Sequence, residues 1–345
     1  MLIKHSAVRV TNSLLSRVDA EIGRKSDADK MRRTGSLSRK PPHETPALPE
    51  GARSYLQADN PRLKELKQKY LALRCAGPDH SHRSDECVSS EIDLQFFRGD
   101  NAYLYQLRDG NAEVNYLLTT YYIQKIDWLG LLSVLEEDGL FSIHIYNFND
   151  ELTISRDLLD SIVEIYFLED TLRISTLPHV CILDIGAGYG RLAYGIVKAL
   201  PGIDKVFCAD DVRESVFLAE CYLHFRGVDA KAIAIPLYQM KDILASNPVD
   251  IATNVHSFSE CTLASVSWWL GILRKYKVRY LMIVPNDGEK LLSRETDGRR
   301  LDFLPLINAR GYRIVAKRSK YEDSSLQEYG VSPTYHYLFE LCAGR

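Results

Sequence analysis

The stretch Asp184-Ile185-Gly186-Ala187-Gly188-Tyr189-Gly190-Arg191 decides the fold of this chain. It begins within VCILDIG, which is typical of a short buried strand, and leads into RLAYGIVKAL, which has the apolar spacing of a helix. Glycines give the turn backbone conformations closed to other residues and let a ligand come close to the main chain. The stretch therefore predicts a strand, a ligand-binding turn and a helix whose N-terminus faces the ligand.

The spacing of these glycines distinguishes two kinds of cofactor loop. Dinucleotide enzymes usually carry G-x-G-x-x-G, whereas this loop is G-x-G-x-G with an acid two residues earlier. The pattern resembles motif I of S-adenosylmethionine-dependent methyltransferases, in which the loop wraps the methionine part of the cofactor. The resemblance implies that S-adenosyl-L-methionine is the cofactor and contacts Asp184, Gly186, Ala187, Gly188 and Gly190.

Strands and helices alternate after residue 179. Apolar runs typical of buried strands end near residues 186, 210, 237, 255 and 286, and helical patterns lie between most of them. This alternation predicts a parallel sheet covered on both faces. YRIVAKRSKY and TYHYLFELC are typical of two further, antiparallel strands. The predicted fold class is α/β: a Rossmann-like class I methyltransferase sheet of parallel strands with a closing antiparallel hairpin, preceded by a helical cap region.

Two regions precede the predicted sheet. Residues 1–50 hold 10 Lys and Arg against 6 Asp and Glu and end in a Pro-rich stretch, so we expect a basic, mobile arm. Residues 51–178 have mainly helical spacing, and Ser155 is positioned to cap the helix RDLLDSIVEIYFLEDTL. We expect a helical cap and substrate region at 51–178, and a cofactor-binding catalytic domain at 179–345.

The composition excludes several classes of protein. Of 345 residues, 46% are apolar and 26% charged, as in globular proteins. The net charge of −3 gives no reason to expect a nucleic-acid partner. No apolar run approaches the roughly 20 residues of a membrane helix, and MLIKHSAVRV lacks a signal-peptide core. Seven cysteines without a CxxC pair indicate a reduced protein, so we expect a cytoplasmic location and no membrane partner.

A second acidic position follows the second predicted strand. KVFCAD ends at Asp210, and Asp211 follows it. A carboxylate at this strand end can accept both hydroxyls of an adenosine ribose, as in dinucleotide-binding folds. We assign this role to Asp210, because it closes the apolar run, with Asp211 as its neighbour. The alternative is that both are only turn residues.

The residues expected to act on the acceptor follow the fourth strand. Parallel α/β sheets bind ligands at the carboxyl ends of their strands, where Asn254 is expected to contact the cofactor. A hydroxyl acceptor must lose its proton, and His is the commonest general base. We assign that role to His256, with Glu260 orienting it or a sugar hydroxyl, and His144 and His336 as secondary candidates. The alternative is that His256 and Glu260 only order the loop.

No metal site is predicted. Asp287 and Glu260 offer oxygen ligands of the kind that Mg²⁺ uses, but the sequence has no dense cluster of acids around them. His80 and His82, between Cys75 and Cys87, are only a weak indication of a metal site.

Several segments together resemble the bacterial sugar O-methyltransferase family. They are TISRDLLDSI (153–162), the glycine loop, NVHSFSE (254–260), IVPN (283–286) and YHYLFEL (335–341). The resemblance covers roughly residues 90–341. It implies a methyl donor, S-adenosyl-L-methionine, and an acceptor hydroxyl on a sugar, free or within an oligosaccharide or other glycoside.

Arg156, within SRDLLDS, is a fixed cation just before the sheet. It can bind a carboxylate through two parallel hydrogen bonds, so we assign it to the methionine end of the cofactor. The alternative is an ion pair with Asp157. The segment FFRGDNAYLYQ is a further candidate to fold over the cofactor, through Arg98, Tyr103 and Gln106.

Three other functions remain open. A methyltransferase for a non-sugar metabolite would have the same loop and a different acceptor site. An NAD-dependent oxidoreductase or epimerase is disfavoured by the glycine spacing, and by the lack of a Tyr-x-x-x-Lys pair near the fourth and fifth strands. A non-catalytic scaffold would not need Asp184, the glycines and Asp210 all intact. A homo-oligomer is compatible with the sequence.

Overall fold

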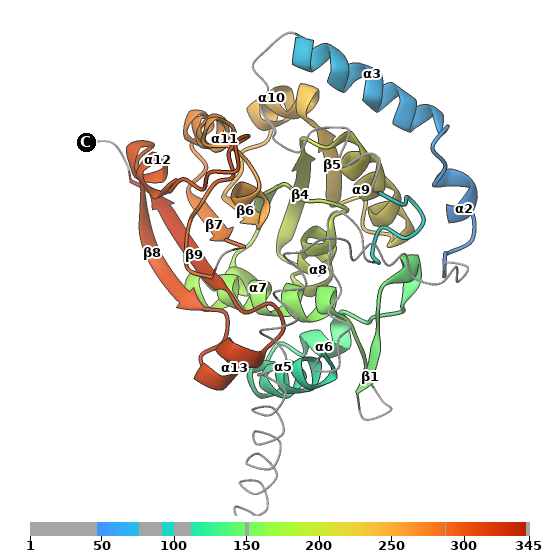
Figure 1. The fold of residues 1–345 in the computed structure, drawn as a ribbon, viewed down its shortest axis with the longest axis vertical. Helices are drawn as coiled ribbons and strands as arrows, with labels where there is room; N and C mark the ends of the chain where they lie inside the picture. Colours follow the sequence, from blue (N-terminus) through green and yellow to red (C-terminus); the bar gives the residue numbers. More distant parts are fainter. Residues whose placement is uncertain (1–46, 76–91, 100–111, 149–151, 287, 343–345) are drawn as a thin grey trace, which may run out of the picture. The chain divides into compact units, whose positions relative to one another are not determined.

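The computed structural model describes residues 47–75, 92–99, 112–148, 152–286 and 288–342 (Figure 1). All of them belong to one unit of the chain. The expected mobile arm lies outside the described residues up to residue 46, as do Tyr103, Gln106 and Asp287. The histidines of the loop after residue 75 lie outside them as well.

A seven-stranded sheet forms the core, in the order β5-β4-β3-β6-β7-β9-β8. The first five strands of this order are parallel, whereas β9 is antiparallel to both of its neighbours. The predicted fold class, parallel strands with a closing antiparallel pair, is confirmed. The strands are β3 (Val180–Ile185), β4 (Ile203–Asp210), β5 (Ala232–Pro236), β6 (Ile251–Val255), β7 (Tyr280–Val284), β8 (Tyr312–Ser319) and β9 (Tyr335–Leu341).

The order of the strands determines where the helices lie. The chain moves outward from β3 to β4 to β5, and then returns to β6 on the other side of β3. Because crossover connections are right-handed, steps in opposite directions place their helices on opposite faces of the sheet. The helices after these strands are α8 (Arg191–Ala199), α9 (Arg213–Phe225), α10 (Leu237–Ser246), α11 (Leu263–Lys275) and α12 (Leu304–Ala309), and α13 (Ser324–Tyr329) lies between β8 and β9.

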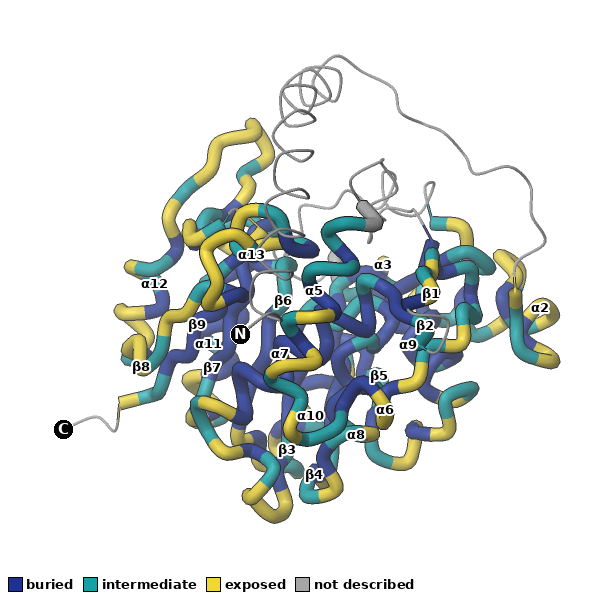
Figure 2. The backbone as a smooth tube through the Cα atoms, turned by 90° about the horizontal axis from the view of Figure 1, so that it is seen from below, coloured by how far each residue is buried: buried dark blue, intermediate teal, exposed yellow. Residues whose placement is uncertain are grey.

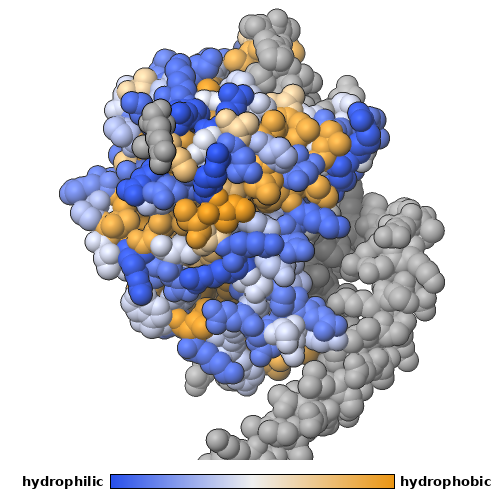
Figure 3. Space-filling model, turned by 90° about the vertical axis from the view of Figure 1, so that its left-hand side faces the viewer, coloured by the Kyte–Doolittle hydropathy of each residue, from blue (hydrophilic) through white to orange (hydrophobic). Residues whose placement is uncertain are grey.

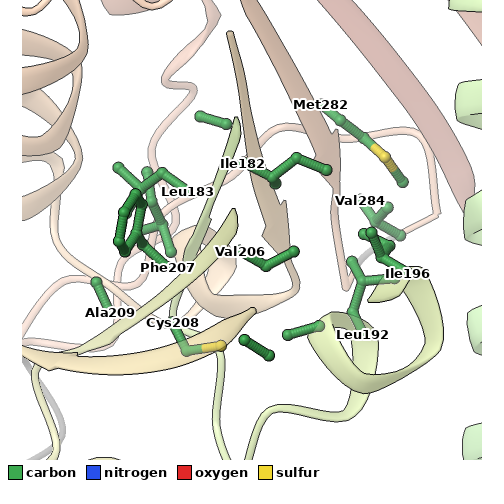
Figure 4. Close-up of a cluster of buried hydrophobic side chains, with 14 of the residues drawn as sticks. Ile182, Leu183, Leu192, Ile196, Val206, Phe207, Cys208, Ala209, Met282 and Val284 are labelled. Carbon is green, nitrogen blue, oxygen red and sulfur yellow. The ribbon is translucent and has the colours of Figure 1, made fainter. Parts of the chain in front are cut away.

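The core between the sheet and α8 is apolar. Figure 4 shows Ile182 of β3, Val206 of β4 and Val284 of β7 near Leu192 and Ile196 of α8. All five side chains are at most 2% exposed, and Figure 2 shows the central strands of the sheet mostly in the colour of buried residues. Burial on both faces explains why these strands are continuous apolar runs and do not alternate with polar residues.

Helix α10 was not predicted. The sequence indicated a strand through Leu237, but β5 ends at Pro236 and the helix begins at the next residue. Pro236 keeps an extended backbone, with φ −64° and ψ 146°, and so separates the two elements within one residue.

Helix α7 (Arg156–Leu172) begins directly after Ser155, the residue predicted to cap its N-terminus. The Ser155 hydroxyl accepts a hydrogen bond from the Leu158 N–H at 3.1 Å, as an N-cap serine does. The helix is buried over most of its length and packs against α8 and β9. Ile165 of α7 would be 3.5 Å from a methyl group at Gly195 of α8, so the two helices are in close contact.

The helical pattern over 121–140 is interrupted in the structure. Helix α5 (Ala112–Ile126) ends before Asp127, whose carboxylate accepts hydrogen bonds from the N–H groups of Leu131 and Leu132 at 2.6 and 3.0 Å. The carboxylate thereby starts a second, short helix, α6 (Leu131–Val134), because it satisfies donors that a helix start leaves free. The helical spacing expected over 51–178 therefore does not continue as one helix through this stretch.

The segment between α6 and α7 also departs from the prediction. A short 3₁₀ turn, η1 (Leu140–Ser142), leads into a two-stranded hairpin of β1 (Tyr146–Phe148) and β2 (Leu152–Ile154). Gly139, with φ 72°, redirects the chain before it. The region before the sheet therefore mixes helix and strand.

At the start of the region with expected helical spacing lies α3 (Pro61–Cys75), preceded by a single turn, α2 (Ala52–Tyr55). It packs against α9 and α10. The Tyr70 hydroxyl donates to the Asp210 carbonyl at 2.8 Å and accepts from the Leu237 N–H at 3.1 Å. Arg62 pairs with Glu220 of α9 at 2.6 Å. Helix α3 therefore bridges the ends of β4 and β5.

The outer strand β8 exposes Ile314 and Val315, at 43% and 51%. Arg313, Lys317 and Arg318 on the same strand carry charges that disfavour pairing with another chain. On the β8 side of the molecule, apolar side chains are interspersed with polar ones (Figure 3). In the part of the chain that the structure describes, no helix has the length and apolarity to cross a membrane.

Candidate functional site

The three glycines of the loop after β3 all adopt positive φ, at 70° for Gly186, 58° for Gly188 and 89° for Gly190. Only glycine enters this region at little cost. A Cβ at Gly186 would lie 2.1 Å from Oγ of Ser257, so this glycine also allows close contact with the end of β6. A Cβ at Gly188 would meet nothing within 4 Å, so this part of the loop backbone has open space beside it.

Strand β4 holds the loop in place. The N–H groups of Gly186 and Ala187 both donate to the carbonyl of Ala209, at 2.8 and 3.3 Å. The Gly188 N–H donates to one oxygen of the Asp210 carboxylate at 2.9 Å, and the Val212 N–H donates to the other at 2.8 Å. The structure therefore brings Asp210 to the glycine loop, where the sequence placed it, and fixes its carboxylate. Asp211, half-buried, follows it at the strand end.

Asp184 lies beneath the loop, within β3. It is 4% exposed, and its carboxyl accepts a hydrogen bond from Oγ1 of Thr253 on β6 at 2.7 Å. Burial raises the pKa of Asp184 to about 7. Its observed contact joins β3 to β6 at the point where the strand order changes direction.

Asn254 orders the turn after β6. Its amide nitrogen donates to the Ile185 carbonyl at 2.9 Å and to Oγ of Ser257 at 2.6 Å, and its oxygen accepts from the Phe258 N–H at 3.0 Å. The side chain is fully buried. These three contacts link the end of β6 to the end of β3, and so hold His256 beside the loop.

His256 has an unusual backbone and an unpaired ring nitrogen. Its φ is 69°, a region that residues with a side chain rarely adopt, and its N–H donates to the Val284 carbonyl at 2.7 Å. Nδ1 is buried without a hydrogen-bond partner in the described part of the chain. Burial, and then the nearby cation Arg156, lower the pKa of His256 to about 3, so the ring is neutral at physiological pH.

Glu260 and the two secondary candidates for the base, His144 and His336, have other contacts. The Glu260 carboxylate accepts from the Asn286 side chain at 3.3 Å. His144, before β1, packs edge to face on Tyr146 at 4.7 Å between ring centroids. His336 is 2% exposed and packs on Phe167 at 5.2 Å. Burial, and then Lys320, lower the pKa of His336 to about 3, which favours the structural interpretation of this histidine.

Arg156 pairs with Asp160, one turn further along α7. Its Nε lies 3.3 Å from Oδ2 of Asp160, and its side chain is 16% exposed. Asp157, the alternative partner, accepts a hydrogen bond from the Tyr189 hydroxyl and lies 3.6 Å from Nε of Arg98. The predicted alternative pair of Arg156 and Asp157 is therefore replaced by a pair with Asp160.

Arg98 lies behind the glycine loop. It is 3% exposed, pairs with Glu137 at 2.7 Å, and its Nε lies 3.4 Å from the Tyr189 hydroxyl. It was a candidate for contact with the cofactor. The structure shows it supporting Tyr189, the residue between the second and third glycines.

A row of buried acids on α7 was missed by the sequence analysis. Asp157, Asp160 and Glu164 share one face of the helix, because they are three and four residues apart. Each has a partner from outside the helix. Glu164 holds Arg191, the first residue of α8, through two hydrogen bonds at 2.9 and 3.0 Å. The spacing of the acids within SRDLLDSIVE was a signal that could have indicated this face.

Asp160 pairs with two cations, one on α7 and one on the connection between β8 and β9. Lys320, 5% exposed, bonds to its carboxylate and to the carbonyls of Val331 and Ser332. Burial alone would raise the pKa of Asp160, but Lys320 and Arg156 lower it to about 2. The carboxylate is therefore ionised, and it ties α7 to the connection between β8 and β9.

Among the described residues, no group of three or more His, Cys, Asp or Glu side chains is arranged to hold a metal ion. Asp287, one of the two acids considered for Mg²⁺, lies outside these residues.

The strand order and the anchored glycine loop define an α/β protein with the Rossmann-like sheet of the methyltransferases. Its sequence matches no protein-family model. It is 31% identical over 121 residues to the release factor glutamine methyltransferase of Flavobacterium psychrophilum, a match that covers 33% of this chain. The chain spans about two fifths (41%) of the length of that relative.

Solved structures of methyltransferases are also similar to the chain. The magnesium protoporphyrin IX methyltransferase of Synechocystis, with bound S-adenosylmethionine, is 11% identical, with a TM-score of 0.38 and coverage of 69% of this chain and 100% of that one. An S-adenosylmethionine-dependent methyltransferase of Aquifex aeolicus is 18% identical, with a TM-score of 0.37 and coverage of 50% and 89%. None of these three names states a sugar acceptor, so the sugar-specific resemblance gains no support from them.

Proposed function

We propose that this chain is an S-adenosylmethionine-dependent O-methyltransferase whose acceptor is a hydroxyl of a sugar or glycoside. One observation carries the proposal. The glycine loop after β3 is joined, through the N–H of its middle glycine, to the carboxylate that ends β4. A loop with open backbone at Gly188 and a fixed acid beside it suits a ligand that carries both a methionine and an adenosine part.

The residues at this site fit such a cofactor. Asp210 accepts one backbone N–H on each carboxylate oxygen, which fixes the carboxylate beside the glycine loop, at the strand end where an adenosine ribose would bind. Arg156, on the first turn of α7, is the candidate partner for the methionine carboxylate. When bound, the cofactor supplies a methyl group on a positively charged sulfur.

The protein's part in the reaction is to hold the acceptor and to take up its proton. As the oxygen–carbon bond forms, the carbon–sulfur bond breaks and the hydroxyl proton moves to a base. His256 is the candidate, since its ring is neutral and Nδ1 has no other partner among the described residues. With a pKa of about 3 the ring is a weak base. A carboxylate bound at Arg156 would offset the cation that lowers this pKa, so cofactor binding would strengthen the base.

The sugar acceptor rests on the resemblance of the 153–162, 254–260, 283–286 and 335–341 segments. A methyltransferase for a non-sugar metabolite remains the second candidate, because it would share the loop and Asp210. The relative that acts on release factors does not decide between them, since its match covers 33% of this chain.

Calorimetric titration with S-adenosylhomocysteine, with NAD⁺ titrated in parallel, tests the proposal. We expect the first ligand alone to bind, in the micromolar range. Asp210→Ala should weaken this binding about tenfold or more, because each lost charge-assisted hydrogen bond contributes about 1.5–3 kcal/mol. Asp170→Asn, an exposed acid on α7, serves as the control. Binding of NAD⁺ instead, or of neither ligand, would refute the methyltransferase assignment.

Methyl transfer from labelled S-adenosylmethionine to a panel of methyl glycosides then tests the acceptor class. Transfer to a hydroxyl of at least one glycoside supports a sugar acceptor. A protein that binds S-adenosylhomocysteine but methylates only non-carbohydrate hydroxyls would establish the second candidate.

A further inference from the structure

The hydroxyl of Tyr70 joins the ends of two neighbouring strands. Tyr70 lies on α3, outside the sheet, and is 1% exposed. Its hydroxyl donates to the carbonyl of Asp210, the last residue of β4, at 2.8 Å, and accepts from the N–H of Leu237, the first residue after β5, at 3.1 Å. Burial raises the pKa of Tyr70, so the hydroxyl keeps the proton that it donates. The two strand ends are therefore joined through a side chain that belongs to neither strand.

This contact lies where the ladder between β4 and β5 ends. Its last pair is Asp210 with Pro236, and α10 begins at the next residue. Proline has no N–H to donate, so the end of β5 offers fewer backbone donors than an ordinary strand end. A tyrosine hydroxyl can donate and accept at the same time. Tyr70 therefore links the two strands beyond the last pair of the ladder.

The carboxylate of Asp210 depends on the same piece of backbone. Its two oxygens accept the N–H groups of Gly188 and Val212, at 2.9 and 2.8 Å. Tyr70 thus holds the carbonyl of Asp210, while the glycine loop and the residue before α9 hold its side chain. A shift of the carbonyl would move the carboxylate relative to the loop, because both groups belong to one residue.

Further contacts hold α3 at the helices that follow these two strands. Lys67 lies 3.4 Å from the carboxylate of Glu214, on the first turn of α9, and the side chain of Glu214 is 4% exposed. The ring of Tyr70 packs edge to face on Tyr238, on the first turn of α10, at 6.0 Å between ring centroids. Helix α3 is therefore bound on both sides of the point where Tyr70 meets the strand ends.

We propose that Tyr70 is a positioning residue for the adenosine part of the cofactor: its hydroxyl holds the end of β4 so that the Asp210 carboxylate meets the ribose hydroxyls. This inference rests on the proposed function and adds a residue of α3 to that site. Ligands of parallel α/β sheets bind at the carboxyl ends of the strands, which is where Tyr70 makes its two hydrogen bonds. Helix α3 thus takes part in cofactor binding, although it precedes the catalytic domain expected from the sequence.

The first test compares S-adenosylhomocysteine with its dideoxy analogue, in which both ribose hydroxyls are replaced by hydrogen, by calorimetric titration. Tyr70→Phe removes the hydroxyl and keeps the ring that packs on Tyr238. We expect this variant to bind S-adenosylhomocysteine about tenfold more weakly, the size of one hydrogen bond to a charged group. The dideoxy analogue should bind to the variant and the parent equally, because it has no ribose hydroxyl for Asp210 to accept.

Tyr312→Phe is the matched control. Tyr312 is fully buried at the start of β8, at the opposite edge of the sheet from β5, and its hydroxyl donates to the Val278 carbonyl at 2.6 Å. Each variant loses one bond from a buried tyrosine to a carbonyl, so both should have a lower melting temperature than the parent. Only Tyr70→Phe should bind S-adenosylhomocysteine more weakly. An equal loss of affinity in Tyr312→Phe would overturn the inference, since the loss would then follow from stability alone.

Hydrogen exchange of the Leu237 amide tests the same link in the parent protein, without any substitution. Binding at Asp210 should stabilise the hydrogen bond from this amide to Tyr70, and a more stable bond opens and exchanges less often. We expect saturating S-adenosylhomocysteine to slow the exchange about fivefold more than the saturating dideoxy analogue does. Equal exchange with the two ligands would overturn the inference.

The titration also separates this inference from the proposed function. If Tyr70→Phe loses affinity equally for both ligands, or for neither, Tyr70 does not position Asp210 and the proposed function stays intact. A parent protein that does not bind S-adenosylhomocysteine would refute both. The two failures are therefore distinguishable.

Discussion

His256 illustrates how strongly the environment of a residue determines its charge and its backbone conformation. A histidine in water titrates near pH 6.5 and acts as a base at neutral pH. Here burial and Arg156 keep the ring neutral, and a φ of 69° aims it from the turn after β6. Strain of this kind is often found at functional sites, so the unusual backbone and the unpaired nitrogen both favour a role in the reaction.

The corresponding prediction is that His256→Ala lowers kcat for methyl transfer by about 10²–10⁴-fold, the usual contribution of a general base. Binding of S-adenosylhomocysteine should not change. His256→Gly, which fits the positive φ without strain, should lose the same activity and be no less stable than the alanine variant. His144→Ala tests the secondary candidate in the same assay. A loss of less than about tenfold in both His256 variants would exclude the role of base.

Helix α7 is the element that connects the parts of the site. One of its faces carries three acids, each of which binds a group from a different element: the glycine loop, α8 and the connection between β8 and β9. Removing one partner of a buried pair is costly, because the other charge stays buried without compensation. The helix therefore fixes the loop and the surroundings of His256 through charge as well as through apolar packing.

We predict that Glu164→Gln destabilises the protein by about 3 kcal/mol, because it leaves Arg191 without its carboxylate. Asp170→Asn, on the same helix, removes an exposed pair with Arg318 and should cost less than about 1 kcal/mol. Chemical denaturation of the two variants measures the difference. If Glu164→Gln costs no more than Asp170→Asn, the buried pair does not organise this part of the fold.

For the molecule as a whole, strand order brings the site together. Strand β3 lies between β4 and β6, where the chain reverses its direction of travel across the sheet. Ligands of such sheets bind at this point, and here it joins the glycine loop, Asp210 and the turn that carries His256. The same assembly encloses two neutral histidine rings, so the stability of the folded molecule depends on pH.

Stability should fall as the pH drops below about 6.5, because His336, with a folded pKa of about 3, takes up a proton only on unfolding. The sign follows from the lowered pKa: the contribution is complete above the unfolded pKa and is lost as the pH falls toward the folded one. The slope for this ring is about 1.4 kcal/mol per pH unit at most. The free energy of unfolding, measured with denaturant at pH values from 7 to 4.5, should fall less steeply with pH for His336→Gln than for the parent protein. An identical slope would show that the ring is already charged in the folded state.

The sequence determined the sheet and the loop. The apolar runs of the strands, the apolar spacing of the helices and the glycine pattern are local signals. Each depends on the burial or the backbone conformation of a few neighbouring residues. Asp184, Gly186, Gly188, Gly190 and the acid of the next strand were therefore found at their correct structural positions. The boundaries between α5 and α6, at Asp127, and between β5 and α10, at Pro236, were not predicted. They depend on single side chains, which a periodic pattern of apolar residues does not reveal.

Only the tertiary structure decided which charges meet. The acids of α7 lie more than 20 residues from Arg191 and more than 150 from Lys320, and no local spacing pairs them. The pKa of His256 likewise depends on what surrounds the ring in space, since burial and charge act across elements distant in sequence. The sequence alone thus determined a cofactor-loop fold, and packing decided which buried polar atoms found partners.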